Sequence, residues 1–324
     1  MNWLLDLIEP AQIWAFQELV LPVMYQSGLM AWADSAFDAT GYFLLALCQI
    51  GILYLFLRPL ESWWPVEKRS DAAAIRTDVL YTFLYRTGAL SLIFFLLLNP
   101  LVSNLEFQLR EWGVTPPNLE DLWPLLQQKP LLAFIAYVVI IDFFEYWRHR
   151  WQHRFRWWWA LHAVHHSQRQ MTLWTDDRNH IVDGLLQSLW MALVAQLIGV
   201  PGTQFIGIVF LTQAVESLSH TNTRLHFGRI GNQLLVSPCF HRMHHAIGLG
   251  HEGRYQGCNF ATLFPLWDRL FGTADYCVRF PATGIRDQLQ GMDYGRGFVA
   301  QQRLGLRRLW AAILAGKPVT SEQS

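Results

Sequence analysis

The arrangement of histidines limits what this chain can fold into more than any other feature. Eight of the twelve histidines fall into three groups at helical spacing: His149 and His153, then His162, His165 and His166, then His241, His244 and His245. Residues three or four apart share one face of an α-helix, so each group can direct its imidazoles toward one point. Imidazole binds iron, zinc, copper and nickel, and eight imidazoles predict a site for two metal ions.

The composition favours a membrane protein. Of the 324 residues, 52% are hydrophobic and 15% are charged, against about 25% charged in soluble domains. The sixteen Trp residues point the same way, because Trp favours the membrane–water interface. Formal net charge is zero, which gives no indication of nucleic-acid binding. The four cysteines form no C-x-x-C pair, so we expect isolated thiols rather than a disulfide framework.

Apolar runs predict an all-α, polytopic helical bundle. A spanning helix needs about 20 apolar residues. The runs that we interpret as spans are Tyr42–Leu57, Leu80–Val102, Pro130–Trp147, Ile181–Val200 and Thr203–Ser219. Acidic residues and prolines interrupt Trp3–Tyr25, so we expect one or two helices lying at the membrane interface there. The first 57 residues contain no Lys or Arg, so no signal peptide is expected.

Basic residues predict the orientation, because cytoplasmic loops carry an excess of Lys and Arg. They concentrate between the first two spans, between His149 and His180, and after His220. Alternating the loops puts the N-terminus outside and all three histidine groups in a cytoplasmic cap. For a bacterial protein the membrane would be the inner one.

Three regions follow from this topology. We expect an N-terminal membrane region over residues 1–129, a catalytic domain over 130–275 and a cytoplasmic tail over 276–324. Within the tail, Leu304–Ala315 has an amphipathic pattern and is expected on the membrane surface. The final residues 317–324 are expected to be loose.

Two acidic residues precede the first histidine pair on the same helical face. Asp142, Glu145, His149 and His153 follow at intervals of three, four and four. A carboxylate one turn below a metal-bound imidazole can accept its second ring N–H and fix its tautomer. The alternative is that both carboxylates sit at the wet interface and pair with Arg148.

Further polar residues end the last predicted span. Glu216 and His220 are four residues apart, and Gln213 lies one turn earlier, so His220 is a ninth candidate ligand. Whether His180 is a ligand stays open, and His226 and His251 are interpreted as surface or outer residues. The pair His251–Glu252 does not extend to H-E-x-x-H, which excludes the zincin motif. Trp157, Trp158 and Trp159 are interpreted as part of an aromatic belt, with the wall of a lipid channel as the alternative.

These motifs together resemble the fatty acid hydroxylase superfamily, which includes sterol desaturases and alkylglycerol monooxygenases. The three histidine groups match, the S-H-T-N segment around His220 and Asn222 is similar to its H-x-N element, and Asn259–Thr273 is similar to its closing signature. There Phe260 and Ala261 replace the usual Tyr and Gly. Asp268 and Arg269, in the same segment, are expected to pair and hold the cap. In D-D-R-N-H-I-V-D, Ile181 and Asp183 depart from the Pro and Glu of the corresponding element. The resemblance covers roughly residues 130–275.

The resemblance implies a non-haem di-iron site that uses O2 to oxidise a membrane lipid. The substrate would be fatty acyl, sterol, alkylglycerol or carotenoid-like, and zinc could occupy the site in purified samples. Electrons would come from a separate redox protein or a small reductant. The implied site residues are Asp142, Glu145, Glu216, Asn222 and Asn259 as catalytic groups, and His149, His153, His162, His165, His166, His220, His241, His244 and His245 as metal ligands.

Other functions remain open at this point. A desaturase would use the same site, because removal of two hydrogens and insertion of oxygen can share one oxidant. A haem-binding electron carrier would need single histidines on facing helices, which adjacent His–His pairs suit less well. A metal-binding sensor without turnover is the third alternative.

Overall fold

The computed structural model describes residues 2–114 and 118–315, so the segment 317–324 that we expected to be loose lies outside the described residues. The helices are α1 (Asn2–Ala15), η1 (Phe16–Val20), α2 (Leu21–Gln26), η2 (Met30–Trp32), α3 (Ala33–Trp63), α4 (Ala72–Arg86), α5 (Ala89–Glu111), α6 (Leu119–Leu122), α7 (Leu125–Gln128), α8 (Pro130–Arg154), α9 (Arg156–His166), α10 (Ile181–Ile198), α11 (Gly202–His220), α12 (Gly228–Leu234), α13 (Pro238–His244), α14 (Leu266–Phe271), η3 (Arg286–Gln290) and α15 (Phe298–Leu314). In this described part, β-structure is limited to one isolated bridge between Ala246 and Thr283. The predicted all-α fold is confirmed.

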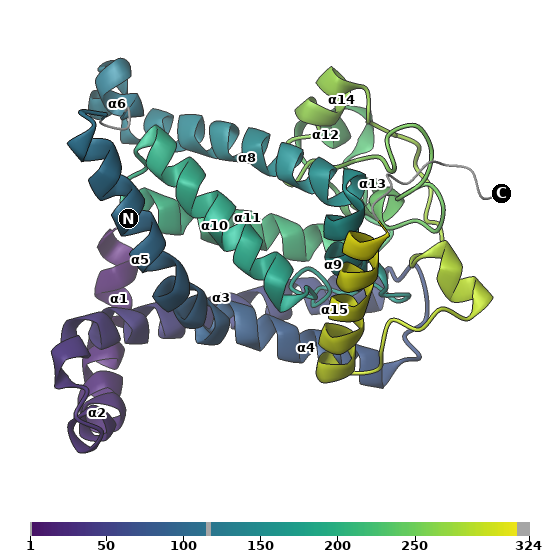
Figure 1. Ribbon diagram of the computed structural model, residues 1–324. Helices are drawn as coiled ribbons and strands as arrows, with labels where there is room; N and C mark the ends of the chain where they lie inside the picture. Colours follow the sequence, from purple (N-terminus) through teal and green to yellow (C-terminus); the bar gives the residue numbers. More distant parts are fainter. Residues whose placement is uncertain (1, 115–117, 316–324) are drawn as a thin grey trace.

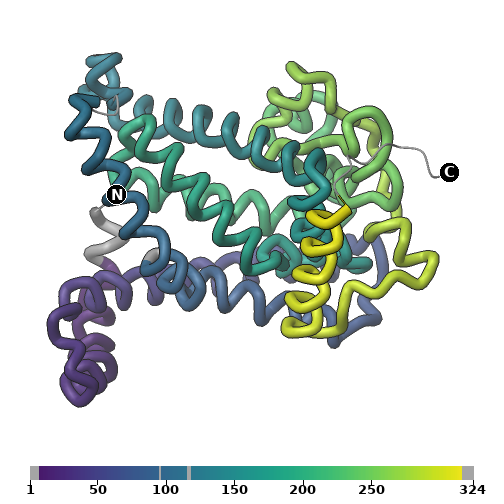
Figure 2. The backbone as a smooth tube through the Cα atoms, viewed as in Figure 1, coloured from purple at the N-terminus to yellow at the C-terminus, as the bar shows by residue number. Residues whose placement is uncertain are grey.

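The long helices form a bundle with a cap at one end (Figure 1). Helices α3, α8, α10 and α11 lie side by side with α10 and α11 antiparallel, and α8 and α11 contact their bundle neighbours. Helices α9, α12, α13, α14 and α15 gather at the end of the bundle opposite α6. The backbone trace shows α1 and α2 projecting away from that cap (Figure 2).

Three helical segments among the described residues are long and apolar enough to cross a membrane: Met30–Trp63, Pro130–Arg154 and Ile181–Ile198. They contain or overlap three of the five predicted spans. The predicted span Leu80–Val102 is wrong as a single helix, because Thr87 and Gly88 separate α4 from α5 and Gly88 has a φ of 92°. The segment Thr203–Ser219 forms α11 as expected, but this helix is not among the three.

The bundle buries one stripe of α8 against α10 and α11. Ala133, Tyr137, Val138 and Ile141 of α8 recur at helical spacing and form one apolar cluster with Val194, Ile208 and Val215. Large apolar side chains elsewhere point outward, including Leu55 and Phe56 of α3 and Leu96 and Leu97 of α5. Such an apolar exterior suits a lipid environment.

Local sequence signals set the turns that position the cap. Helix α10 ends at Gly199, whose φ of 64° favours glycine, and Pro201 precedes α11. Phe155 adopts an extended conformation between α8 and α9, which turns α9 back against α8. Ser237 caps α13 by accepting a hydrogen bond from the Phe240 N–H, and Pro238 occupies the first turn.

Candidate metal centre

Four helices bring the nine candidate ligands together. They form two groups, in each of which the possible ligand atoms all lie within 4.8 Å of one another. The first group contains His149, His153, His162, His166 and His244, and the second contains His165, His220, His241 and His245. All nine side chains are buried. On α9, His162 and His166 belong to the first group and His165 to the second. In the α13 segment, His241 and His245 belong to the second group and His244 to the first. Residues four apart therefore serve the same group, while the histidine between them serves the other.

Backbone carbonyls face the outer ring nitrogen of five of the nine histidines. The Nδ1 atoms of His149, His153 and His244 contact the backbone carbonyls of Phe260 (2.8 Å), Gln256 (3.1 Å) and Cys258 (2.8 Å). In the second group, Nδ1 of His165 faces the Arg178 carbonyl (3.3 Å) and Nδ1 of His220 faces the Glu216 carbonyl (2.8 Å). A carbonyl only accepts, so each of these Nδ1 atoms carries the proton. Each Nε2 of a neutral ring is then left with a lone pair.

The inner nitrogens fit metal ions. The Nε2 atoms of His149, His162 and His244 have no hydrogen-bond partner in the described part of the chain. The other Nε2 atoms face one another, at 3.1 Å for His153–His166, 3.3 Å for His165–His220, 3.0 Å for His220–His241 and 3.2 Å for His241–His245. Where both rings of a contact carry the proton on Nδ1, as His165 and His220 do, the two lone pairs repel unless a cation lies between them. Two such clusters therefore suit two cations.

Burial keeps the imidazoles of the cap neutral. Burial, and secondarily the charges of His220 and His251, lower the pKa of His244 to about 3. Burial together with neighbouring imidazoles also holds the pKa values of His165, His166 and His245 well below the ordinary value. Neutral imidazole is the form that ligates a metal.

Asp183 is the carboxylate that holds a candidate ligand in place, and the sequence analysis did not select it. It is fully buried on α10 and accepts hydrogen bonds from Nδ1 of His162 (3.3 Å), Nε2 of Gln152 (2.9 Å) and Nε1 of Trp158 (2.7 Å). A carboxylate behind a ligating imidazole fixes its tautomer. The sequence feature that could have indicated this role is that Asp183 is an acidic residue in the first turn of an otherwise apolar helix.

The expected role of Asp142 is wrong. Its carboxylate accepts from the backbone N–H groups of Leu263 (2.8 Å) and Phe264 (3.0 Å) and from the Trp267 indole (2.9 Å). It therefore fastens the cap to α8. The backbone carbonyl of Phe260, rather than a carboxylate, takes the outer nitrogen of His149.

Glu145 follows the alternative considered above. It accepts three hydrogen bonds from Arg148, the shortest at 2.7 Å, and both side chains are buried rather than at a wet interface. The helix spacing of three residues brings this pair together. Both side chains line the cavity described below.

Asn222 and Asn259 act as links between segments. The Asn222 amide accepts from the backbone N–H groups of Val66 and Glu67 and donates to the Glu67 carbonyl, which joins the loop after α3 to the end of α11. Asn259 has a φ of 56° and donates to the carbonyls of Phe240 and Asp275. Both side-chain amides therefore hydrogen-bond to backbone groups and hold separate chain segments together.

The three other histidines lie outside the two ligand groups. His180 caps α10 by accepting from the Val182 N–H and faces the Gln302 carbonyl through Nε2, outside both groups. His226 accepts from the Gly228 N–H. His251 stacks on Trp159 at 5.5 Å.

Two further predictions need correction. Asp268 holds the backbone N–H groups of Phe260 and Ala261, while Arg269 contacts Gln233, so these two do not pair with each other. The belt interpretation is wrong for Trp158, which is buried against Asp183, and for Trp159, whose ring packs against His153 and His166.

A buried network around Arg86 was also not anticipated. Its guanidinium pairs with Asp176 and Asp177 and donates to Ser217 (2.8 Å), which ties α4 to the loop before α10 and to α11. Burial is the main cause that raises the pKa of Asp177 to about 7. The sequence feature that could have indicated this network is a basic residue, Arg86, near the start of a predicted span.

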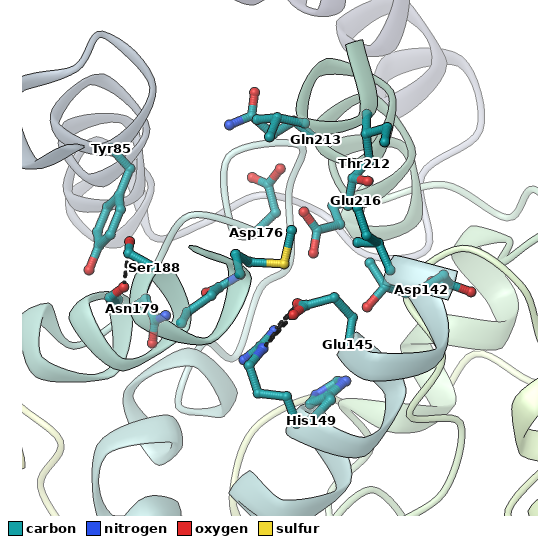
Figure 3. A pocket seen from close by; sticks show the side chains of 18 of the residues that line it. Tyr85, Asp142, Glu145, His149, Asp176, Asn179, Ser188, Thr212, Gln213 and Glu216 are labelled. Carbon is teal, nitrogen blue, oxygen red and sulfur yellow. Dashed lines mark hydrogen bonds and ion pairs between the residues drawn. The ribbon is translucent and has the colours of Figure 1, made fainter. Parts of the chain in front are cut away.

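A cavity of about 670 Å³ connects the histidines with the membrane helices. Its wall includes His149, His162, His165, His220 and His241 at one end and Gly199, Gly202 and Phe205 at the other. Gly202 and His220 are the two ends of α11, so the cavity extends along this helix for about 27 Å at 1.5 Å per residue. Figure 3 shows Glu145, Asp176 and Glu216 facing the same space near His149. This shape admits a long apolar chain whose end reaches the metal centre.

Comparisons with known proteins agree with this architecture. Residues 134–273 match the family model described as Fatty acid hydroxylase. The chain is 26% identical over 318 residues to ornithine lipid hydroxylase OlsE of Rhizobium tropici, covering 94% of this chain and 88% of the relative.

Two other relatives are similar over shorter stretches, and no solved structure matches. Alkylglycerol monooxygenase of Danio rerio is 30% identical over 145 residues, which is 44% of this chain and 29% of that protein. Lathosterol oxidase of Rattus norvegicus is 24% identical over 193 residues, or 60% of this chain and 61% of the relative. The chain is thus similar to the fatty acid hydroxylase family over residues 134–273, and the relatives named here are a lipid hydroxylase, a monooxygenase and an oxidase.

Proposed function

We propose that this protein hydroxylates a membrane lipid with O2 at a site where nine histidines hold two iron ions. The observation that carries the proposal is the cavity, because its wall joins the histidine groups to an apolar channel between membrane helices. The relatives named above act on ornithine lipid, alkylglycerol and a sterol, so we propose a lipid with a polar head as the substrate. Two bound iron ions would supply the oxygen activation.

The chain's own residues would prepare the site. The carbonyls behind His149, His153 and His244 hold the protons on the outer nitrogens, so the inner nitrogens stay available to the metals. Asp183 does the same for His162. Apolar residues such as Ile141, Met191 and Leu263 would exclude water and guide the lipid chain.

We further propose that the histidine groups lie on the cytoplasmic side of a bacterial inner membrane. A soluble redox protein or a small reductant could reach them there. The five Arg residues between His149 and His180, together with Arg148 just before them and the basic residues that follow His220, support this orientation. The catalytic unit would be residues 130–275, with residues 1–129 anchoring it and α15, in the region 276–324, covering α9.

The test is mass spectrometry of lipids from cells that express the wild type or His244→Ala under ¹⁸O2. We expect one lipid to gain a single labelled oxygen with the wild type only. Loss of two hydrogens without label would assign a desaturase instead. Equal labelling with His244→Ala, at equal membrane abundance, would contradict the proposed site, because His244 Nε2 is one of the inner nitrogens.

A further inference from the structure

The wall of the cavity changes from apolar to polar along α11. The residues of α11 that line it, from the α10–α11 turn toward the histidines, are Phe205, Ile208, Val209, Thr212, Gln213, Glu216, Ser219 and His220. They recur every three or four residues and so form one continuous stripe. Apolar residues start this stripe at Phe205, Ile208 and Val209, and polar residues occupy it from Thr212 to His220, with Glu216 one turn before the metal centre.

Helix α10 also places polar residues near the cap. Gln187 and Ser188 line the cavity near the beginning of this helix, while Ala192, Ala195 and Gln196 line it near the end, where the Gln196 amide donates to Glu106. Because α10 and α11 are joined by the short turn at Gly199, the polar parts of both helices lie toward the cap. The polar zone is therefore a property of the cavity and not of one helix.

Glu216 is the acidic side chain of α11 in this zone, and its carboxylate lacks a hydrogen-bond or ion-pair partner among the described residues. Arg148 is engaged by Glu145, and Arg86 is engaged by Asp176 and Asp177. Within residues 2–114 and 118–315, no hydrogen bond or ion pair reaches the Glu216 carboxylate, although its backbone carbonyl accepts from Ser219 and His220. Its carboxylate belongs to neither ligand group. In Figure 3 it faces the cavity beside Asp176.

An acidic side chain inside a membrane bundle is costly unless it is paired, so Glu216 calls for a donor from outside the chain. The apolar channel beyond it already suits a hydrocarbon tail. A lipid that fills both parts would place its polar end at Glu216.

We propose that Glu216 is a substrate-positioning residue that accepts a hydrogen bond from an N–H or O–H group at the polar end of the lipid. This inference rests on the proposed function, and it identifies the part of the lipid that is oxidised. Since Glu216 is one helical turn, about 5.4 Å, from His220, the reacting carbon lies near the polar end and not at the end of the tail.

The experiment measures lipid retention by the purified, iron-loaded chain, without a reductant, with native mass spectrometry. The probes are hexadecylamine, hexadecanol and methyl hexadecyl ether, which share one tail and differ in hydrogen-bond donation. We expect the wild type to retain the amine and the alcohol over the ether. Glu216→Gln should lower retention of the amine by about 10-fold or more, the effect of losing a hydrogen bond to a charged group. Glu111→Gln, at the exposed end of α5, should leave all three unchanged.

Several outcomes would overturn the inference. Equal retention of the three probes by the wild type would do so, as would an unchanged preference in Glu216→Gln. Loss of bound iron in Glu216→Gln with the lipid preference intact would assign Glu216 to the metal centre instead. If Glu216→Gln does not fold, Glu216→Asp, which shortens the side chain, should weaken the same preference.

Retention needs no turnover, so this test is separate from that of the proposed function. Absence of labelled lipid in wild-type cells would contradict the proposed hydroxylation but not the binding preference at Glu216. If labelled lipid does form, fragmentation of the product should place the new oxygen near the polar end. A label at the far end of the tail would contradict the inference.

Discussion

At the scale of single residues, the protonation state of six of the nine candidate ligands is set from outside the metal centre. Backbone carbonyls and Asp183 occupy the outer nitrogens of His149, His153, His162, His165, His220 and His244, which leaves the lone pairs on their inner nitrogens. The histidine spacing could be read from the sequence because the helix repeat is fixed. Their hydrogen-bond partners could not, because Phe260, Gln256 and Cys258 come from a loop about 100 residues away from His149 and His153.

Asp183→Asn is expected to weaken metal binding by about 10–100-fold, the usual cost of removing a carboxylate behind a ligating histidine. The amide cannot accept as strongly from His162 Nδ1, and one of its sides becomes a donor toward Gln152 and Trp158. Metal content after dialysis against graded chelator concentrations measures this. Exposed Asp293→Asn is the matched control, and equal retention in both variants would refute the role of Asp183.

The metal-free protein should lose stability as the pH falls below about 6.5. Its buried histidines have folded-state pKa values below those of the unfolded chain, so the unfolded chain binds more protons there. The loss continues toward pH 3, the pKa of His244 being about 3. Each such histidine contributes up to about 1.4 kcal/mol per pH unit to the decrease in the free energy of unfolding. A thermal unfolding midpoint that stays constant from pH 7 to pH 5 would disagree.

At the scale of elements, helix α15 completes the support of α9. Gly305 and Gln301 of α15 are buried, Gln301 accepts a hydrogen bond from Tyr81 of α4, and the Gln302 carbonyl faces His180 at the start of α10. The sequence indicated an amphipathic segment over Leu304–Ala315 but not its partner, since exposed Leu306 and Trp310 share the helix with the packed face. The break at Gly88 was missed for a related reason, because the apolar run continues across it.

Gly305→Val should loosen α15. A Cβ atom at this position would lie 2.4 Å from Cδ2 of His180, whose ring is fixed by hydrogen bonds on both nitrogens. Overpacking of this kind costs about 1–3 kcal/mol. Hydrogen exchange of the α15 amides should rise relative to the wild type, while Gly51→Ala in α3, with open space around it, should leave them unchanged. Full protection of α15 in Gly305→Val would contradict this packing.

At the scale of the whole molecule, apolar helices hold a cap that carries the polar chemistry. Composition and the histidine pattern predicted the all-α bundle and the gathering of the nine histidines. The cavity was beyond the sequence, because its wall combines α4, α5, α8, α10 and α11 with loop residues such as Asp176 and Leu263. The polarity gradient inside it becomes visible only when α10 and α11 are placed antiparallel.

The proposed orientation can be tested with Cys277, an exposed thiol of the cap. In a variant that keeps Cys277 and replaces Cys48, Cys239 and Cys258 by Ser, a membrane-impermeant maleimide should label inverted vesicles and leave intact spheroplasts unlabelled. The excess of Lys and Arg on the cap side is the physical reason. Labelling in intact spheroplasts would reverse the topology.

The most direct measurement is the iron content of the purified, reconstituted protein and of one variant for each histidine group. We predict two ions per chain in the wild type, and about one in both His149→Ala/His244→Ala and His220→Ala/His241→Ala, since each pair belongs to a different group. A wild-type value of one ion, or loss of both ions in either variant with the helical content preserved, would contradict two separately held metals.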